Sequence, residues 1–161
     1  VLRGQTSSDG ARRLFREDDP EAAACRGRGV AERSRRVNIH IVTIPHKAQD
    51  YETVGNWNFT STGGLVISVS EMGDWRKELL VAAHELVEAA LCKHRKIAEA
   101  DVTAWDLAYE AQRKEGDVSE PGDDPCCPYR EPHIFATKIE QMLAEALGVD
   151  WAEYAKAIEE L

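Results

Sequence analysis

The sequence contains no apolar run that approaches the ~20 residues needed to cross a bilayer as a helix. Its first residues also lack the apolar core of a signal peptide, so we expect neither export nor membrane insertion. Positive charge is scarce, because 20 Lys+Arg stand against 29 Asp+Glu and the formal net charge is -9. This acidity argues against nucleic acid and anionic membranes as partners. Together these absences predict a cytoplasmic protein.

Cysteine is sparse, and its spacing excludes two further classes of protein. The four cysteines, Cys25, Cys92, Cys126 and Cys127, include no C-x-x-C pair. A zinc ribbon needs such pairs, and a secreted disulfide framework needs cysteines at higher density. We therefore expect reduced thiols.

The charge is unevenly distributed along the 161 residues. Residues 1–36 contain nine arginines, no lysine and six acidic residues, a net charge of +3, and they show no helical or strand periodicity. We interpret them as a disordered basic arm. Residues 37–161 contain 11 Lys+Arg and 23 acidic residues, a net charge of -12. Their number suits one domain, so we predict an arm followed by a single acidic domain.

The pattern along residues 37–161 predicts an α+β fold, a small sheet followed by a long helix and two or three further helices. Alternating β-branched residues indicate the strands, and apolar residues at helical spacing indicate the helices. The strands are expected at 37–44, 51–59 and 65–69. The helices are expected from 75 to about 95, at 99–115, at 133–147 and in a short segment after Asp150.

The predicted helix at 75–95 carries the residues that most suggest chemistry. Its apolar residues are expected to form one buried stripe, which includes Leu79 and Leu80. His84 and Glu88 lie at the edge of that stripe, four positions and about 40° apart around the helix. An imidazole and a carboxylate in this arrangement can chelate one divalent metal ion without distorting the backbone.

The pentapeptide H-E-L-V-E at 84–88 resembles the H-E-x-x-H helix of zinc-dependent metallopeptidases, the zincins, with Glu88 in place of the second histidine. The order of elements agrees, because zincins place a small sheet before this helix. The resemblance implies a zincin-like fold, one divalent metal ion with zinc as the first choice, and Glu85 as the general base. A carboxylate ligand also admits manganese or iron, and it leaves open which glutamate binds the metal.

A catalytic metal of this kind requires a third protein ligand, and two histidines are candidates. His94 follows His84 by ten residues, the spacing of the third metzincin histidine, but Leu91 stands where that group has a glycine. His133 opens a predicted helix directly after a 17-residue acidic loop, so its side chain can face a cleft. The predicted metal ligands are His84, Glu88 and His133.

Four further polar residues receive lesser roles. Asp123 and Asp124, in the acidic loop at 116–132, are expected to support a metal ligand or to contact the substrate. His40 and His46 belong to the first predicted strand and its end, and we expect both on the surface.

Three longer blocks, at 71–96, 120–125 and 133–151, are similar to a group of short phage- and prophage-encoded proteins of unassigned function. This similarity covers most of residues 50–155. It implies a phage or prophage origin, and therefore the cytoplasm of a host bacterium. It implies no particular activity.

The sequence favours a divalent-metal-dependent hydrolase that acts on a peptide bond, with a peptide or protein as substrate. Two alternatives stay open. Glu85 and Glu88 form an E-x-x-E, half of the signature of all-α nucleoside-triphosphate pyrophosphatases, which bind Mg²⁺ through four carboxylates, but the next helix has no E-x-x-D. The protein could also be a non-enzymatic phage accessory protein whose acidic surface occupies a basic partner.

Overall fold

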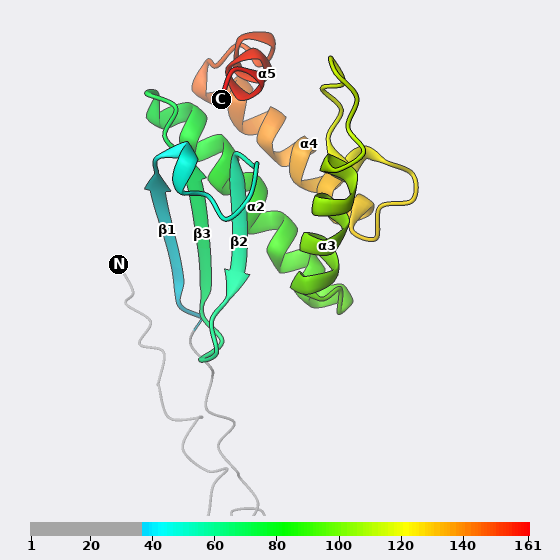
Figure 1. The fold of residues 1–161 in the computed structure, drawn as a ribbon. Coiled ribbons are helices and arrows are strands. Elements are labelled where there is room, and N and C mark those ends of the chain that lie inside the picture. Colours follow the sequence, from blue (N-terminus) through cyan, green and yellow to red (C-terminus); the bar gives the residue numbers. More distant parts are fainter. Residues whose placement is uncertain (1–36) are drawn as a thin grey trace, which may run out of the picture. The chain divides into compact units, whose positions relative to one another are not determined.

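A computed structural model describes residues 37–161, and the predicted basic arm at 1–36 lies outside the described residues. The described part is an α+β fold, as predicted, with one three-stranded sheet and four α-helices (Figure 1). The strands are β1 (Ile39–Ile44), β2 (Gly55–Phe59) and β3 (Leu65–Ser70). The helices are α2 (Trp75–Arg95), α3 (Glu99–Glu110), α4 (Arg130–Leu147) and α5 (Trp151–Glu159), and short 3-10 turns η2 (His46–Ala48) and η3 (Pro121–Asp123) lie in the loops.

The sheet is mixed, with β3 in its centre. β1 pairs with β3 in parallel and β2 pairs with β3 antiparallel, so that Ile67 of β3 is the partner of both Ile41 and Trp57. The second predicted strand is wrong for its first four positions, because the chain turns before Gly55. There the Thr53 hydroxyl donates to the Gly55 carbonyl at 2.6 Å, which satisfies that carbonyl locally.

Helix α2 packs on one face of the sheet, and α4 packs along α2 (Figure 1). The predicted bounds of α2 are confirmed. Its N-terminus is capped by Asp74, whose side chain accepts from the Arg76 N–H, and its C-terminus closes on Lys96 in the left-handed conformation. The predicted buried stripe is wrong in its orientation, since Leu79 is 40% exposed whereas His84 and Glu88 are buried. The sheet and α4 together cover the face that carries these two polar residues.

The remaining helices depart from prediction mainly at their ends. Helix α3 ends at Glu110 rather than 115, and α4 begins at Arg130, three residues before the predicted start. Pro132 accounts for the second difference, because proline is tolerated in the first turn of a helix. Gly148 in the left-handed conformation ends α4 as predicted, and Asp150 caps α5.

Two further observations concern the whole described part. Within residues 37–161, no helix combines the length and the apolar character that a membrane span requires. The three cysteines in this range, Cys92, Cys126 and Cys127, are free thiols, while Cys25 lies outside it.

Candidate metal centre

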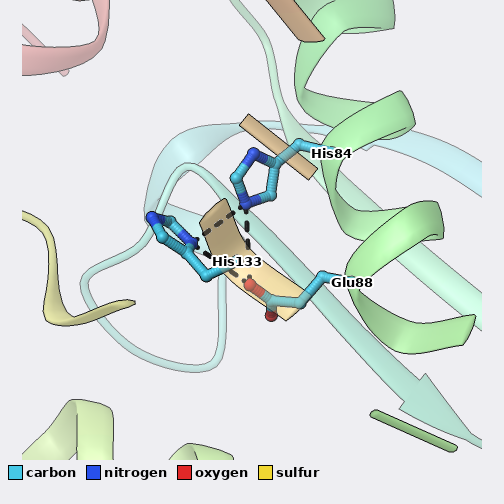
Figure 2. Close-up of side chains that lie close together, drawn as sticks. All are labelled: His84, Glu88 and His133. Carbon is cyan, nitrogen blue, oxygen red and sulfur yellow. Dashed lines mark hydrogen bonds and ion pairs between the residues drawn. The ribbon is translucent and has the colours of Figure 1, made fainter. Parts of the chain in front are cut away.

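The three predicted metal ligands come together at one point between α2 and α4 (Figure 2). His133 Nδ1 lies 3.2 Å from His84 Nε2 and 3.2 Å from Glu88 Oε2, and His84 Nε2 lies 3.6 Å from Glu88 Oε2. Two residues come from successive turns of α2 and the third from the first turn of α4. The packing of these two helices therefore assembles the cluster.

The spacing of the three atoms fits one tetrahedral metal ion. Ligands bound to zinc at about 2.0–2.1 Å lie about 3.3 Å from one another in a tetrahedron. The observed separations of 3.2, 3.2 and 3.6 Å surround that value. Two imidazoles and one carboxylate are also a donor set found in catalytic zinc sites. His84, Glu88 and His133 are thus suited in both distance and chemistry to hold a divalent ion.

The outward atom of each of these three residues has its own hydrogen-bond partner. Glu140 of α4 accepts from His84 Nδ1 at 2.8 Å, and the hydroxyl of Tyr154 donates to the other Glu140 oxygen. With Nδ1–H donating to Glu140, a neutral His84 imidazole would direct the lone pair of Nε2 at the cluster. Metal-binding histidines almost always have such a carboxylate or carbonyl partner on the second nitrogen, and it fixes the tautomer and the ring orientation.

The other two residues of the cluster are held in the same way. His133 Nε2 lies 3.1 Å from Glu120 Oε2, so Nδ1 faces the other two residues of the cluster. The indole N–H of Trp57 donates to Glu88 Oε1 at 3.0 Å, which leaves Oε2. The loop before α4 approaches His133 closely, because a Cβ on Gly122 would lie 2.2 Å from the ring. The ring and the loop therefore fix each other in place.

The cluster is buried, with exposed fractions of 9% for His84, 5% for Glu88 and 6% for His133. Burial lowers the pKa of both histidines, but hydrogen bonds to carboxylates outweigh it: the pKa of His133 is raised to about 9, and that of His84 well above its usual value. Glu88 has a pKa of about 2, since its contacts with the two histidines overcome the effect of burial. These contacts favour the protonated form of both imidazoles, so a divalent ion that binds here would displace protons.

Glu85, the predicted general base, lies outside the three-residue cluster but lines the same cavity, whose volume is about 210 Å³. Its carboxylate lies against the backbone of β2, where a Cβ on Gly55 would come within 2.5 Å of Glu85 Oε1. Burial, and then repulsion from Glu88, raise the pKa of Glu85 to about 8. The structure thus separates the two glutamates: Glu88 contacts the histidines, and Glu85 faces the cavity.

The other candidates from the sequence lie elsewhere or play smaller parts. His94 is exposed on α2, and His40 is exposed on β1. His46 was expected on the surface, but it is half-buried because its ring bonds to the Ser70 hydroxyl. Asp123 lies 3.8 Å from His133 Nε2, farther than Glu120, and Asp124 instead accepts from the Cys126 N–H.

Several residues at the site were not predicted from the sequence. Glu140 had a usable signal, because it follows His133 by seven residues and so lies on the same face of a helix, two turns later. Asp106, which accepts from the hydroxyls of Tyr51 and Tyr129, had none. Tyr51, Asp106 and Tyr129 come from distant parts of the chain, and all three also line the cavity.

The partner of His84 provides a first experimental test. Glu140→Gln or Tyr154→Phe is expected to lower zinc affinity by about 10–100-fold, the usual cost of losing a residue that orients a ligand. Tyr109→Phe is the matched control, since the Tyr109 hydroxyl bonds to Ser119 at the surface. Competition with a chromophoric chelator measures the affinities. Unchanged affinity in both site variants would contradict the assigned orientation of His84.

Comparison with known proteins finds no similarity that could extend these observations, as neither a family model nor a curated protein nor a solved structure matches the chain.

Proposed function

We propose that this protein is a divalent-metal-dependent hydrolase of zincin type that acts on peptide bonds. The observation that carries the proposal is the convergence of His84 Nε2, Glu88 Oε2 and His133 Nδ1 at tetrahedral spacing beside a cavity. Zinc is the first choice for two imidazoles and a carboxylate, and manganese or iron can use the same donors. Three protein ligands are also the number that leaves a coordination position open for chemistry.

The residues around the cavity suit hydrolysis. A divalent ion in this site would lower the pKa of a water molecule and would polarise a carbonyl group. In this proposal Glu85, which lines the same cavity, accepts the proton of the attacking water and returns it to the leaving amine. Its raised pKa favours that role, because a general base works best with a pKa near the operating pH. The absence of a side chain at Gly55 leaves room for this carboxylate, since a Cβ there would lie 2.5 Å from Glu85 Oε1.

The edge of the sheet supports a peptide as substrate. The Phe59 N–H donates to Glu99 Oε2 at 2.8 Å, so Phe59 turns its backbone away from β3. In an antiparallel pair, the backbone N–H and C=O groups of successive residues point alternately toward and away from the partner strand. Those of Gly55 and Trp57 therefore point away from β3, as those of Phe59 do. Gly55 and Trp57 both line the cavity, and the Gly55 carbonyl already accepts a hydrogen bond from the Thr53 hydroxyl. The N–H and C=O of Trp57 are thus placed to pair with an added peptide strand.

The geometry favours this proposal over the two alternatives. A pyrophosphatase-type magnesium site would need Glu85 and Glu88 to face carboxylates of α3, whereas the Glu88 oxygens contact Trp57 and His133. Asp106 of α3 is bound by two tyrosine hydroxyls. The alternative of a non-enzymatic accessory protein with an acidic surface gives no reason for three buried ligand atoms at metal spacing, each with a supporting hydrogen bond.

The proposal predicts metal-dependent peptide cleavage. Zinc-loaded protein is expected to cleave members of a mixed peptide library, with new termini identified by mass spectrometry. A chelator should stop cleavage, and added zinc, manganese or iron should restore it. The Glu85→Gln protein, purified in parallel, controls for contaminating peptidases. Absence of cleavage with each of the three metals would contradict the proposal.

A further inference from the structure

Asp106 of α3 is a buried carboxylate that the proposed reaction does not use. It is 9% exposed, and each of its oxygens accepts from a tyrosine hydroxyl: Oδ2 from Tyr51 at 3.1 Å and Oδ1 from Tyr129. Glu88 and Glu140, which are also buried, each contact a histidine instead. Burial raises the pKa of Asp106 to about 6, although the two hydroxyls act to lower it. A carboxylate in such a place costs stability, which favours a role for the contacts that it makes.

The two tyrosines belong to different parts of the chain. Tyr51 lies in the segment between η2 and β2, and Tyr129 lies directly before α4. Both tyrosines line the cavity together with Asp106 and His133. Asp106 therefore joins three segments of the cavity wall, and one of them leads directly into the helix that carries His133.

The start of α4 is not fixed by a cap of the usual kind. Asp74 and Asp150 cap α2 and α5 with their side chains, whereas the N-cap residue of α4 is Tyr129, whose side chain makes no capping hydrogen bond. The Tyr129 hydroxyl instead donates to Asp106. A contact between two helices thus takes the place of a local cap.

Tyr129 contacts His133 in two ways. Its carbonyl accepts from the His133 N–H at 3.0 Å, and the two rings meet edge to face with their centroids 6.3 Å apart. A displacement of Tyr129 would therefore move the first turn of α4. That turn supplies His133 Nδ1, the third atom of the candidate metal centre.

We propose that Asp106 positions His133 for metal binding by holding the hydroxyl of Tyr129. Tyr51 occupies the second carboxylate oxygen and so fixes the orientation of the carboxylate. Asp106 is thus a positioning residue that acts through Tyr129, not a metal ligand. The inference rests on the metal centre of the proposed function, but it does not depend on which reaction the metal supports.

Zinc affinity, measured by competition with a chromophoric chelator, provides the test. Tyr129→Phe and Asp106→Ala are expected to bind zinc about 2–10-fold more weakly than wild type, the effect of losing one hydrogen bond. Asp106→Asn should retain most of the affinity, because its amide oxygen can accept from Tyr129 and its N–H can donate to the oxygen of Tyr51. Tyr109→Phe and Asp101→Ala are the matched controls on α3, since the Tyr109 hydroxyl bonds at the surface and Asp101 is exposed. Both controls should match wild type.

Two further measurements distinguish positioning from a general loss of stability. The visible absorption bands of Co²⁺ bound in place of zinc depend on ligand geometry, so they should shift in Tyr129→Phe but not in Tyr109→Phe. The double variant Asp106→Ala/Tyr129→Phe should bind zinc no more weakly than Asp106→Ala alone, because both changes break the same contact. Glu140→Gln, which acts on His84, should instead lower the affinity of Asp106→Ala further.

The inference is contradicted if Asp106→Ala and Tyr129→Phe both match wild type in zinc affinity and cobalt spectrum, or if their effects add in the double variant. Thermal unfolding of the metal-free protein shows whether Asp106→Ala folds. If it does not, Tyr129→Phe, which removes a single oxygen atom, carries the test. Absence of zinc binding by the wild-type protein would overturn the metal centre itself, and with it both the proposed hydrolase function and this inference.

Discussion

Replacing His133 by alanine is expected to lower zinc affinity by more than about 100-fold, the upper end for losing a residue that merely supports a ligand. The physical reason is that His133 Nδ1 is the only cluster atom supplied by α4, at 3.2 Å from both partners on α2. Without His133, only the two candidate ligands on α2 remain, His84 and Glu88. Two ligands rarely hold a catalytic metal. Isothermal titration of the metal-free protein with zinc measures the change.

His94→Ala is the matched control, because it removes the same side chain from an exposed position on α2. Its zinc affinity is expected to equal that of the wild-type protein. Circular dichroism and thermal unfolding without metal show whether each variant folds, and His133→Asn offers a smaller change if alanine does not. Tight zinc binding by the His133 variants, or its loss in His94→Ala, would refute the assignment of the third ligand.

Replacing Glu85 by glutamine is expected to lower the rate of peptide cleavage by about 10²–10⁴-fold, the usual contribution of a general base. Zinc content should stay at the wild-type level, because Glu85 lies outside the ligand cluster. A separate stability effect is expected. The pKa of Glu85 is raised from 4.5 to about 8, so the folded protein binds more protons than the unfolded chain between these values. Stability contributed by this residue therefore falls as pH rises from 4.5 to 8.

Glutamine removes that pH-dependent cost, so metal-free Glu85→Gln protein should unfold at a higher temperature than wild type at pH 8. Glu145→Gln, an exposed carboxylate on α4, should change neither cleavage nor unfolding temperature appreciably. A residue whose replacement stabilises the protein but lowers its activity is typical of a functional site. Undiminished cleavage by zinc-loaded Glu85→Gln protein would exclude Glu85 as the base.

Local signals were sufficient to predict much of the fold. Asp74 and Asp150 cap helices through their own side chains, and Gly148 ends α4 in the left-handed conformation. Each of these effects depends on residues within one helical turn. The bounds of α2 were therefore predictable, as was the α+β class from the succession of strand and helix patterns.

Effects that arise between elements were harder to anticipate. Leu79 has the same apolar character as Leu80, yet it is 40% exposed, since the partners of α2 decide which face is covered. The hydrogen bonds of Trp57 to Glu88 and of Tyr154 to Glu140 span 31 and 14 residues. The H-E-x-x-E spacing indicated two ligands on one helix, but only the packing of α4 on α2 brings in the third and its supporting residues.

X-ray absorption at the zinc edge tests the central claim most directly. The claim is that His84, Glu88 and His133 bind one divalent ion. For protein loaded with zinc and freed of excess metal, the account predicts one zinc per chain. It also predicts nitrogen and oxygen neighbours at about 2.0–2.1 Å, with the outer-shell scattering of two imidazoles. Sulfur neighbours at about 2.3 Å, or no retained zinc, would contradict it.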